Sequence, residues 1–124
     1  MEEIVGMPIT HSRQHFLKVR FPDTFDALDA CGIRDDYSLG WPDEAGFRAS
    51  ITTPFPFYNL EKECETQLML HPLHIMDGAL MRCCKGEEEY AQVTSVLRER
   101  VEQHGGEFVT LQHNSAGKQI SALQ

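Results

Sequence analysis

Residues 73–113 read LHIMDGALMRCCKGEEEYAQVTSVLRERVEQHGGEFVTLQH. Two short apolar segments, residues 73–76 and 108–112, flank the long segment 87–104. Apolar side chains recur in that long segment at steps of three and four residues: Tyr90, Val93, Leu97 and Val101. This spacing predicts a helix with one apolar face, and the flanking segments are typical of buried strands. A strand–helix–strand order of this kind indicates a parallel α/β unit.

The sequence upstream of this unit extends the same alternation. Residues 9–15 predict a short strand, and a helix is expected to begin at Asp23 or Thr24 and to end at Gly32. A brief strand follows at residues 36–39, and residues 40–56 are rich in turn formers and predict a long loop. A proline at position 72 makes the next strand begin at Leu73. We therefore expect an α/β fold with two main helices, either a partial (β/α) barrel or a small open, mostly parallel sheet, since a complete barrel needs about 250 residues.

Length and charge limit the class of protein. The chain has 124 residues and a net charge of −8, so we expect one α/β domain over residues 1–113 and a polar tail over 114–124. The acidic balance argues against a nucleic-acid partner, and no apolar run reaches the roughly 20 residues that span a bilayer. We therefore expect no membrane partner. The N-terminus lacks the pattern of a signal peptide, and the four cysteines fit free thiols better than disulfides or a zinc site, so we expect a cytoplasmic location.

Polar side chains follow several of the expected strands. His15 follows the first strand, Arg48 lies in the long loop, Asp77 directly follows residues 75–76, and His113 directly follows residues 111–112. Functional groups in parallel α/β folds gather beyond the carboxyl ends of the strands, so these four are expected on one rim. Taken singly, each is more often a loop cap or a surface residue. An aspartate beside a histidine fixes its tautomer and favours its protonated form, as a general acid requires.

The remaining histidines and aromatic residues have simpler interpretations. Pro72 lies between His71 and His74 and excludes the helical spacing of a zinc-binding pair, so we interpret these histidines as polar residues on the surface. His11 and His104 are expected to face solvent. Trp41 is expected to anchor the long loop, with stacking on a sugar ring as the open alternative.

Six short segments in fixed order carry a resemblance to a known family. The segments are RQHFL (13–17), CGIRDDYSLG (31–40), GFRA (46–49), PFPF (54–57), MDGAL (76–80) and LQHN (111–114). Together they resemble the C-terminal half of a bacterial branch of the polysaccharide deacetylase superfamily. The match covers nearly the whole chain.

The resemblance implies a portion of a distorted (β/α) barrel with a carbohydrate deacetylase site. It implies that His113 is the catalytic acid, that Asp77 tunes it, and that Arg48 steadies a carboxylate base. Members of this family hydrolyse N- or O-acetyl groups on sugars with a divalent metal, which an Asp and two His of the N-terminal half hold. The sequence has no segment that corresponds to those ligands. His11 and His15 are spaced as HxxxH, but they lie just before and within the later RQHFL segment, so no ligand role is transferred to them. We therefore expect no metal ligands and no cofactor in this chain, and a divalent metal only in a complete family member.

The sequence thus predicts a truncated or split deacetylase-like protein, a hydrolase relative that retains the acid side of the site and is inactive alone. In the alternative, it is a noncatalytic carbohydrate- or protein-binding module in which His15, Trp41 and Phe47 contact the ligand. The expected partners are an acetylated carbohydrate and either a second copy or a chain that supplies the missing half. A third interpretation is a self-associating structural remnant, with an interface formed by Phe16, Phe55 and Phe57.

Overall fold

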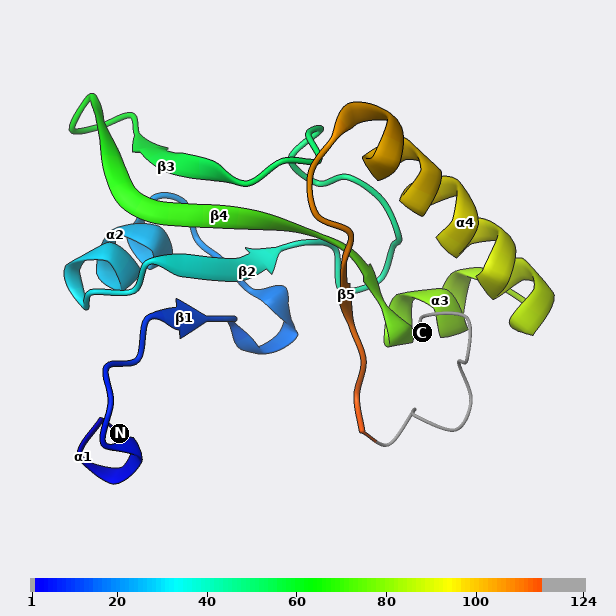
Figure 1. Cartoon of the computed structure of the whole chain (residues 1–124), viewed down its shortest axis with the longest axis horizontal. Helices are drawn as coiled ribbons and strands as arrows, with labels where there is room; N and C mark the ends of the chain where they lie inside the picture. The colour runs from blue at the N-terminus through cyan, green and yellow to red at the C-terminus, as the bar shows by residue number, and fades with distance from the viewer. Residues whose placement is uncertain (1, 115–124) are drawn as a thin grey trace.

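The computed structural model describes residues 2–114 and shows an α/β fold (Figure 1). The tail expected over 114–124 lies outside the described residues except for position 114. The elements in chain order are α1 (Glu2–Val5), β1 (His11–Ser12), the 3-10 turn η1 (His15–Leu17), α2 (Asp23–Ala30), β2 (Asp35–Leu39), β3 (Phe55–Asn59), β4 (Cys64–Met76), α3 (Asp77–Cys83), α4 (Glu87–His104) and β5 (Val109–Leu111).

The 13-residue strand β4 is the centre of an open, curled sheet. The strand order is β1-β2-β4-β3, and β5 pairs with the C-terminal part of β4. Strands β1, β2, β4 and β5 run parallel, whereas β3 and β4 form an antiparallel hairpin. The mostly parallel sheet with helices is consistent with part of a (β/α) barrel, as expected. The carboxyl ends of four strands therefore point toward one end of the sheet.

Strand β4 differs from the sequence-based expectation. It begins at Cys64 rather than after Pro72, and it is a central strand of the sheet. Proline cannot donate to a sheet ladder and is tolerated at irregular pairings. The register of β2 on β4 shifts between Asp36 and Leu39, and Leu39 pairs with Pro72 at that shift. The irregular pairing accommodates the proline inside the sheet.

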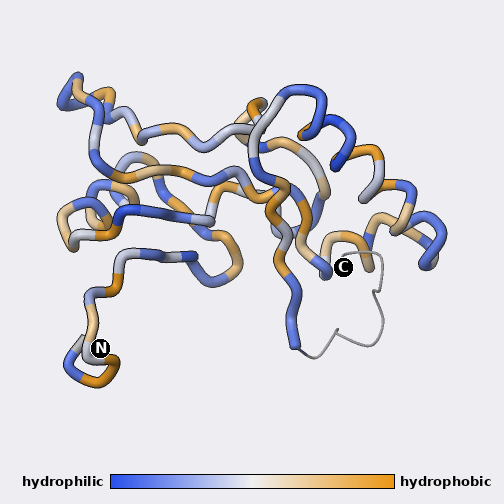
Figure 2. The backbone as a smooth tube through the Cα atoms, viewed as in Figure 1, coloured by the Kyte–Doolittle hydropathy of each residue, from blue (hydrophilic) through white to orange (hydrophobic). Residues whose placement is uncertain are grey.

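The buried core consists of clusters spread along the length of β4. Phe25 of α2 packs with Phe57, Leu68 and Leu70 near the start of β4. At the other end, the apolar face of α4 covers Ile75 and neighbouring side chains, which confirms the expected helix and its buried face; the packed residues of α4 are Tyr90, Val93 and Leu97. Figure 2 shows the corresponding alternation of hydrophobic and hydrophilic residues along α4.

Two predictions about exposure are wrong. His71 and His74 are buried in β4, with 8% and 1% of their surface exposed, so they are not surface residues. Phe57 is only 5% exposed and belongs to the core, so it forms no interface, whereas Phe16 is 60% exposed. The error for the histidines follows from the late start assigned to β4, because a central strand buries both of its faces.

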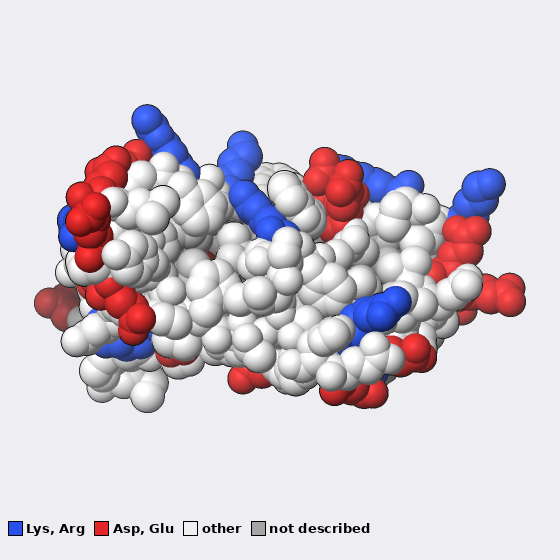
Figure 3. All heavy atoms as spheres, turned by 90° about the horizontal axis from the view of Figure 1, so that it is seen from above, with Lys and Arg blue, Asp and Glu red and all other residues white. Residues whose placement is uncertain are grey.

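The hydropathy of the helices and the distribution of charge on one face can be described for residues 2–114. Among residues 2–114, no helix combines the length and the apolar character needed to cross a membrane. On the face shown in Figure 3, acidic and basic side chains are interspersed around a mostly uncharged centre rather than gathered in a basic patch. That face lacks the clustered cations of a phosphate-backbone binder.

Candidate functional site

Asp77 lies at the point where β4 ends and α3 begins. Its side chain is buried, with 1% of the residue exposed. The carboxylate oxygen Oδ1 accepts the backbone N–H of Gly78 at 2.7 Å. An isolated buried carboxylate is costly, and such groups occur only with hydrogen-bond donors around them.

His113 supplies two further donors to this carboxylate. It follows β5, whose residue Leu111 is in register with Met76 at the end of β4. The ring Nδ1 lies 2.7 Å from Asp77 Oδ1, and the backbone N–H donates to Oδ2 at 2.6 Å. Because a carboxylate only accepts, Nδ1 carries a hydrogen and Nε2 is the nitrogen left to exchange a proton. The structure thus brings together the pair that the sequence placed after two neighbouring strands.

The environment keeps Asp77 ionised. Burial raises the pKa of this carboxyl, but the hydrogen bonds from the His113 backbone and ring and from the Gly78 backbone outweigh it and hold the pKa below its ordinary value. The side chain of His113, by contrast, is 55% exposed. A buried anion therefore orients a solvent-accessible imidazole, which is the arrangement of a general acid or base with its orienting carboxylate.

His113 and His15 line the same cavity, which has a volume of about 440 Å³. His15 comes from η1, after β1, and its ring packs against Phe16. The other lining residues are Arg13, Gln14, Phe16, Met76 and Leu111. Two imidazoles, a guanidinium and an amide thus gather at the carboxyl ends of β1, β4 and β5.

A buried carboxylate in β2 holds the His15 segment in place. Asp36 is fully buried and accepts the hydroxyl of Ser12, together with the hydroxyl and backbone N–H of Ser38 at 2.9 and 2.8 Å. The Ser38 hydroxyl oxygen in turn accepts the backbone N–H of Gln14 at 2.8 Å. This network fastens the chain before His15 to the end of β2.

The turn at η1 is anchored by an apolar side chain and carries backbone strain. Phe16 and Leu17 have φ values of 56° and 53°, in the left-handed region that side chains with a Cβ rarely adopt. Leu17 is 2% exposed and packs with Leu73, Met76 and Ala79. Burial of Leu17 holds the strained turn, and with it His15, at the rim of the cavity.

Arg48 and Trp41 lie in a different cavity, of about 550 Å³. The Arg48 guanidinium stacks over the Trp41 ring at 4.8 Å and donates to the carbonyl oxygens of Gly40 at 3.0 Å and Leu17 at 3.5 Å. Phe16 lines both this cavity and the one beside His113. Of the four polar residues expected on one rim, His15 and His113 therefore line one cavity and Arg48 lines another, whereas Asp77 is buried behind His113.

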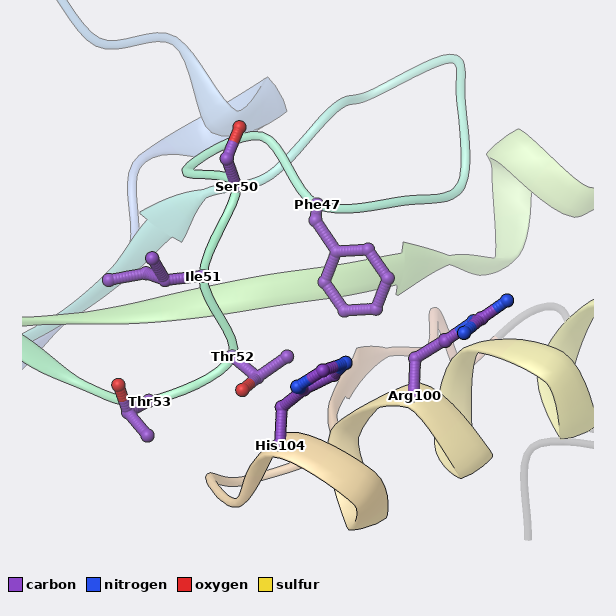
Figure 4. A pocket seen from close by; sticks show the side chains of 7 residues that line it. All are labelled: Phe47, Ser50, Ile51, Thr52, Thr53, Arg100 and His104. Atoms are coloured by element: carbon purple, nitrogen blue, oxygen red, sulfur yellow. The ribbon is translucent and has the colours of Figure 1, made fainter.

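Phe47 is also separate from the His113 cavity. Its ring meets the buried His74 ring edge-on at 5.0 Å. It lines a third cavity with residues of α4 (Figure 4). Of the candidate residues, only His15, Asp77 and His113 form one site.

Sequence reasoning did not identify Asp36, Ser38 or Arg13 as contributors to this site. The alternation of Asp36 and Ser38 within a five-residue strand places both on one face of β2. Polar residues at alternate positions of a central strand indicate a buried hydrogen-bonded network, so this signal was present in the sequence. Arg13 carries no comparable pattern.

Within residues 2–114, no group of three or more His, Cys, Asp or Glu side chains is placed to hold a metal ion. His15 and His113 share a cavity, but the hydrogen bonds of Asp77 are directed to His113 and Gly78. A catalytic zinc needs about three protein ligands around an open position. The described residues do not fit the metal site of a complete deacetylase.

Comparisons of the chain with protein-family models, with curated proteins and with solved structures found no match.

Proposed function

We propose that this chain provides the acid side of a carbohydrate deacetylase site, with His113 as the acid, Asp77 as its orienter and His15 on the rim. The observation that carries this proposal is the Asp77–His113 pair, a buried ionised carboxylate bonded to an exposed imidazole that opens into a cavity. The resemblance of six sequence segments to the deacetylase superfamily supports the choice of substrate.

The chemistry assigned to the pair is proton donation to a leaving group. Hydrolysis of an acetamide consumes water, breaks the C–N bond and releases acetate and an amine. The protonated His113 ring gives the Nε2 proton to the leaving nitrogen and becomes neutral, while Asp77 stays ionised. A carboxylate that stabilises an imidazolium and holds its tautomer is the standard support for such a step.

Activation of the water is assigned to groups outside this cavity. The described residues do not fit a metal site, so we route no step through a metal held by them and propose that another segment or a partner chain completes the site. Arg48 receives no catalytic role here, because both of its hydrogen bonds go to backbone carbonyls.

The four free thiols fit a reducing compartment, and a cytoplasmic location is part of this proposal.

Calorimetric titration with N-acetylated and fully deacetylated chitooligosaccharides tests the proposal. We expect the chain to bind the acetylated oligomer, and His113→Gln and His15→Ala to weaken binding. Acetate release in the presence of zinc, cobalt or nickel is expected to stay at the uncatalysed rate. Equal affinity for both oligomers would contradict the proposed substrate. A stoichiometric metal with turnover abolished by His113→Ala would contradict the assignment of the metal to another segment.

A noncatalytic sugar-binding module is the second candidate, and Trp41 favours it. Trp41 is 41% exposed and lines the cavity beside Arg48, and aromatic rings with a polar neighbour are suited to binding sites. Trp41→Ala would then abolish sugar binding, whereas His113→Gln would leave it unchanged. The acid-side proposal expects the opposite ranking.

A further inference from the structure

A cavity of about 620 Å³ lies between the loop after β2 and the C-terminal part of α4. Figure 4 shows Phe47 and Thr52 pointing from the loop toward α4, and Arg100 and His104 rising from α4 toward the loop. Ser50, Ile51 and Thr53 complete its lining. It shares no lining residue with the His113 cavity, so any role it has is independent of the Asp77–His113 pair.

The charge in this cavity contrasts with that of the chain. The chain carries 19 Asp and Glu, yet none of the seven lining residues has a carboxylate. Among residues 2–114, no ion pair involves Arg100 or His104. The helical neighbours of Arg100 at three and four residues carry no carboxylate: Val96, Leu97, Gln103 and His104.

The loop side of the cavity is held in place by contacts at the end of α4. The Thr52 hydroxyl donates to the Gly105 carbonyl, and the Thr52 carbonyl accepts the backbone N–H of Glu107 at 3.4 Å. Gly106 has a φ of +116°, and a Cβ there would lie 2.1 Å from the Thr52 carbonyl oxygen, so only glycine permits this approach. Phe47 is fixed by its contact with the buried His74. The cavity is therefore preformed.

We propose that this cavity binds a small anion, a phosphate or carboxylate group attached to an apolar ring. Arg100 forms charge-assisted hydrogen bonds to the anionic group, His104 adds a second donor, and Phe47 packs against the ring. The volume is in the range of small-molecule sites. The overall negative charge of the chain repels anions, so binding depends on these two side chains.

Titration of the ¹⁵N-labelled full chain with phenyl phosphate, benzoate, inorganic phosphate and neutral benzyl alcohol tests this site. We expect saturable shifts of the amides in segments 47–53 and 100–106 with phenyl phosphate or benzoate, and the tighter of the two identifies the anionic group. Arg100→Gln is expected to weaken binding about tenfold, and Arg100→Lys to recover part of it. Arg82→Gln, which removes an exposed arginine of α3, is the matched control.

Several outcomes would overturn the site. Benzyl alcohol binding as tightly as phenyl phosphate would show that the anionic group is not recognised. An equal loss in Arg82→Gln would show that general charge alone attracts the ligand, and the absence of saturable shifts with every probe would remove the site. As a control for folding, Arg100→Gln is expected to unfold at the same temperature as the wild type, so that its loss of binding is not a loss of folding.

Discussion

Asp77 accepts both the ring Nδ1–H and the backbone N–H of His113, at 2.7 and 2.6 Å. Since one residue supplies both donors, the carboxylate fixes the ring and also the path of the chain after β5. The same carboxylate accepts the backbone N–H of Gly78 at the start of α3. Asp77 thus joins the ends of β4 and β5, and its role is structural as well as chemical.

Replacement of Asp77 by Asn is expected to destabilise the fold. Asn keeps one acceptor oxygen, but its amide group presents donors to the backbone N–H groups that now meet a carboxylate. Breaking a buried charged network costs about 2–4 kcal/mol of the free energy of unfolding. Chemical denaturation measures this, with Asp43→Asn in the exposed loop after β2 as the control, which should change by less than about 0.5 kcal/mol. Equal stability of the two variants would contradict the proposed network.

The same pair makes a specific pH dependence. The folded-state pKa of Asp77 is below its ordinary value of 3.8, so its contribution to stability is present above that pH and is lost as the pH falls through the folded pKa. The stability difference between wild type and Asp77→Asn should therefore shrink between pH 7 and about pH 3. Urea denaturation at both pH values measures it, and a difference that grows on acidification would contradict the hydrogen-bond assignment.

The sequence predicted the parts of the fold that depend on local periodicity. The α4 helix matches its expected span, Glu87–His104, because the apolar spacing, the acidic first turn and the two glycines after it agree. The pairing of Asp77 with His113 followed from two apolar strands that end in polar residues. Both signals are contained in short stretches of the chain.

What the sequence did not predict depends on pairing between distant residues. The β3–β4 hairpin was missed because β3 contains Pro56 and the first half of β4 is polar, and those residues form strands only because they pair with each other. The burial of His71 and His74 follows from the central place of β4 in the sheet. His71 then bridges Asp35 at 2.8 Å and Glu107 at 3.0 Å, and no pattern near His71 in the sequence reveals these contacts.

His74 is expected to make stability fall on mild acidification. Its Nδ1 accepts the backbone N–H of Val109, so Nε2 carries the hydrogen and, among the described residues, has no partner. Burial holds the pKa of His74 below 6.5, because the charged ring would be out of contact with water. Its contribution is therefore full above pH 6.5 and is lost as the pH falls below that value toward the folded pKa.

His74→Phe tests this dependence. The rings of Phe47 and Phe108 flank this position, so a phenyl ring fits the same apolar contacts. The variant should lose less stability than wild type between pH 7 and about pH 5, whereas His104→Gln, at an exposed position, should behave like wild type. If the free energy of unfolding fell as much with pH in His74→Phe as in the wild type, His74 would not resist protonation.

Gly40 is expected to be essential for the junction of β2 with β4. A Cβ at this position would lie 2.6 Å from the Leu73 carbonyl oxygen and 2.8 Å from its side chain. Gly40→Ala should destabilise the protein by about 1–3 kcal/mol, because the backbone of Leu73 cannot move without shifting β4. Gly86→Ala, where nothing lies within 4 Å of the new Cβ, is the control for denaturation experiments. Equal effects would show that β2 and β4 are less closely packed at this point.

The most direct test of the acid-side assignment is the nuclear magnetic resonance signal of the His113 ring during titration with an N-acetylated chitooligosaccharide. In the free protein, the Nδ1–H signal should be observed and should disappear in Asp77→Ala. Saturating sugar should shift the Nε2 resonance strongly and leave the Nδ1–H bond to Asp77 in place. Sugar binding that leaves both ring nitrogens of His113 unchanged would contradict the assignment of this residue as the acid.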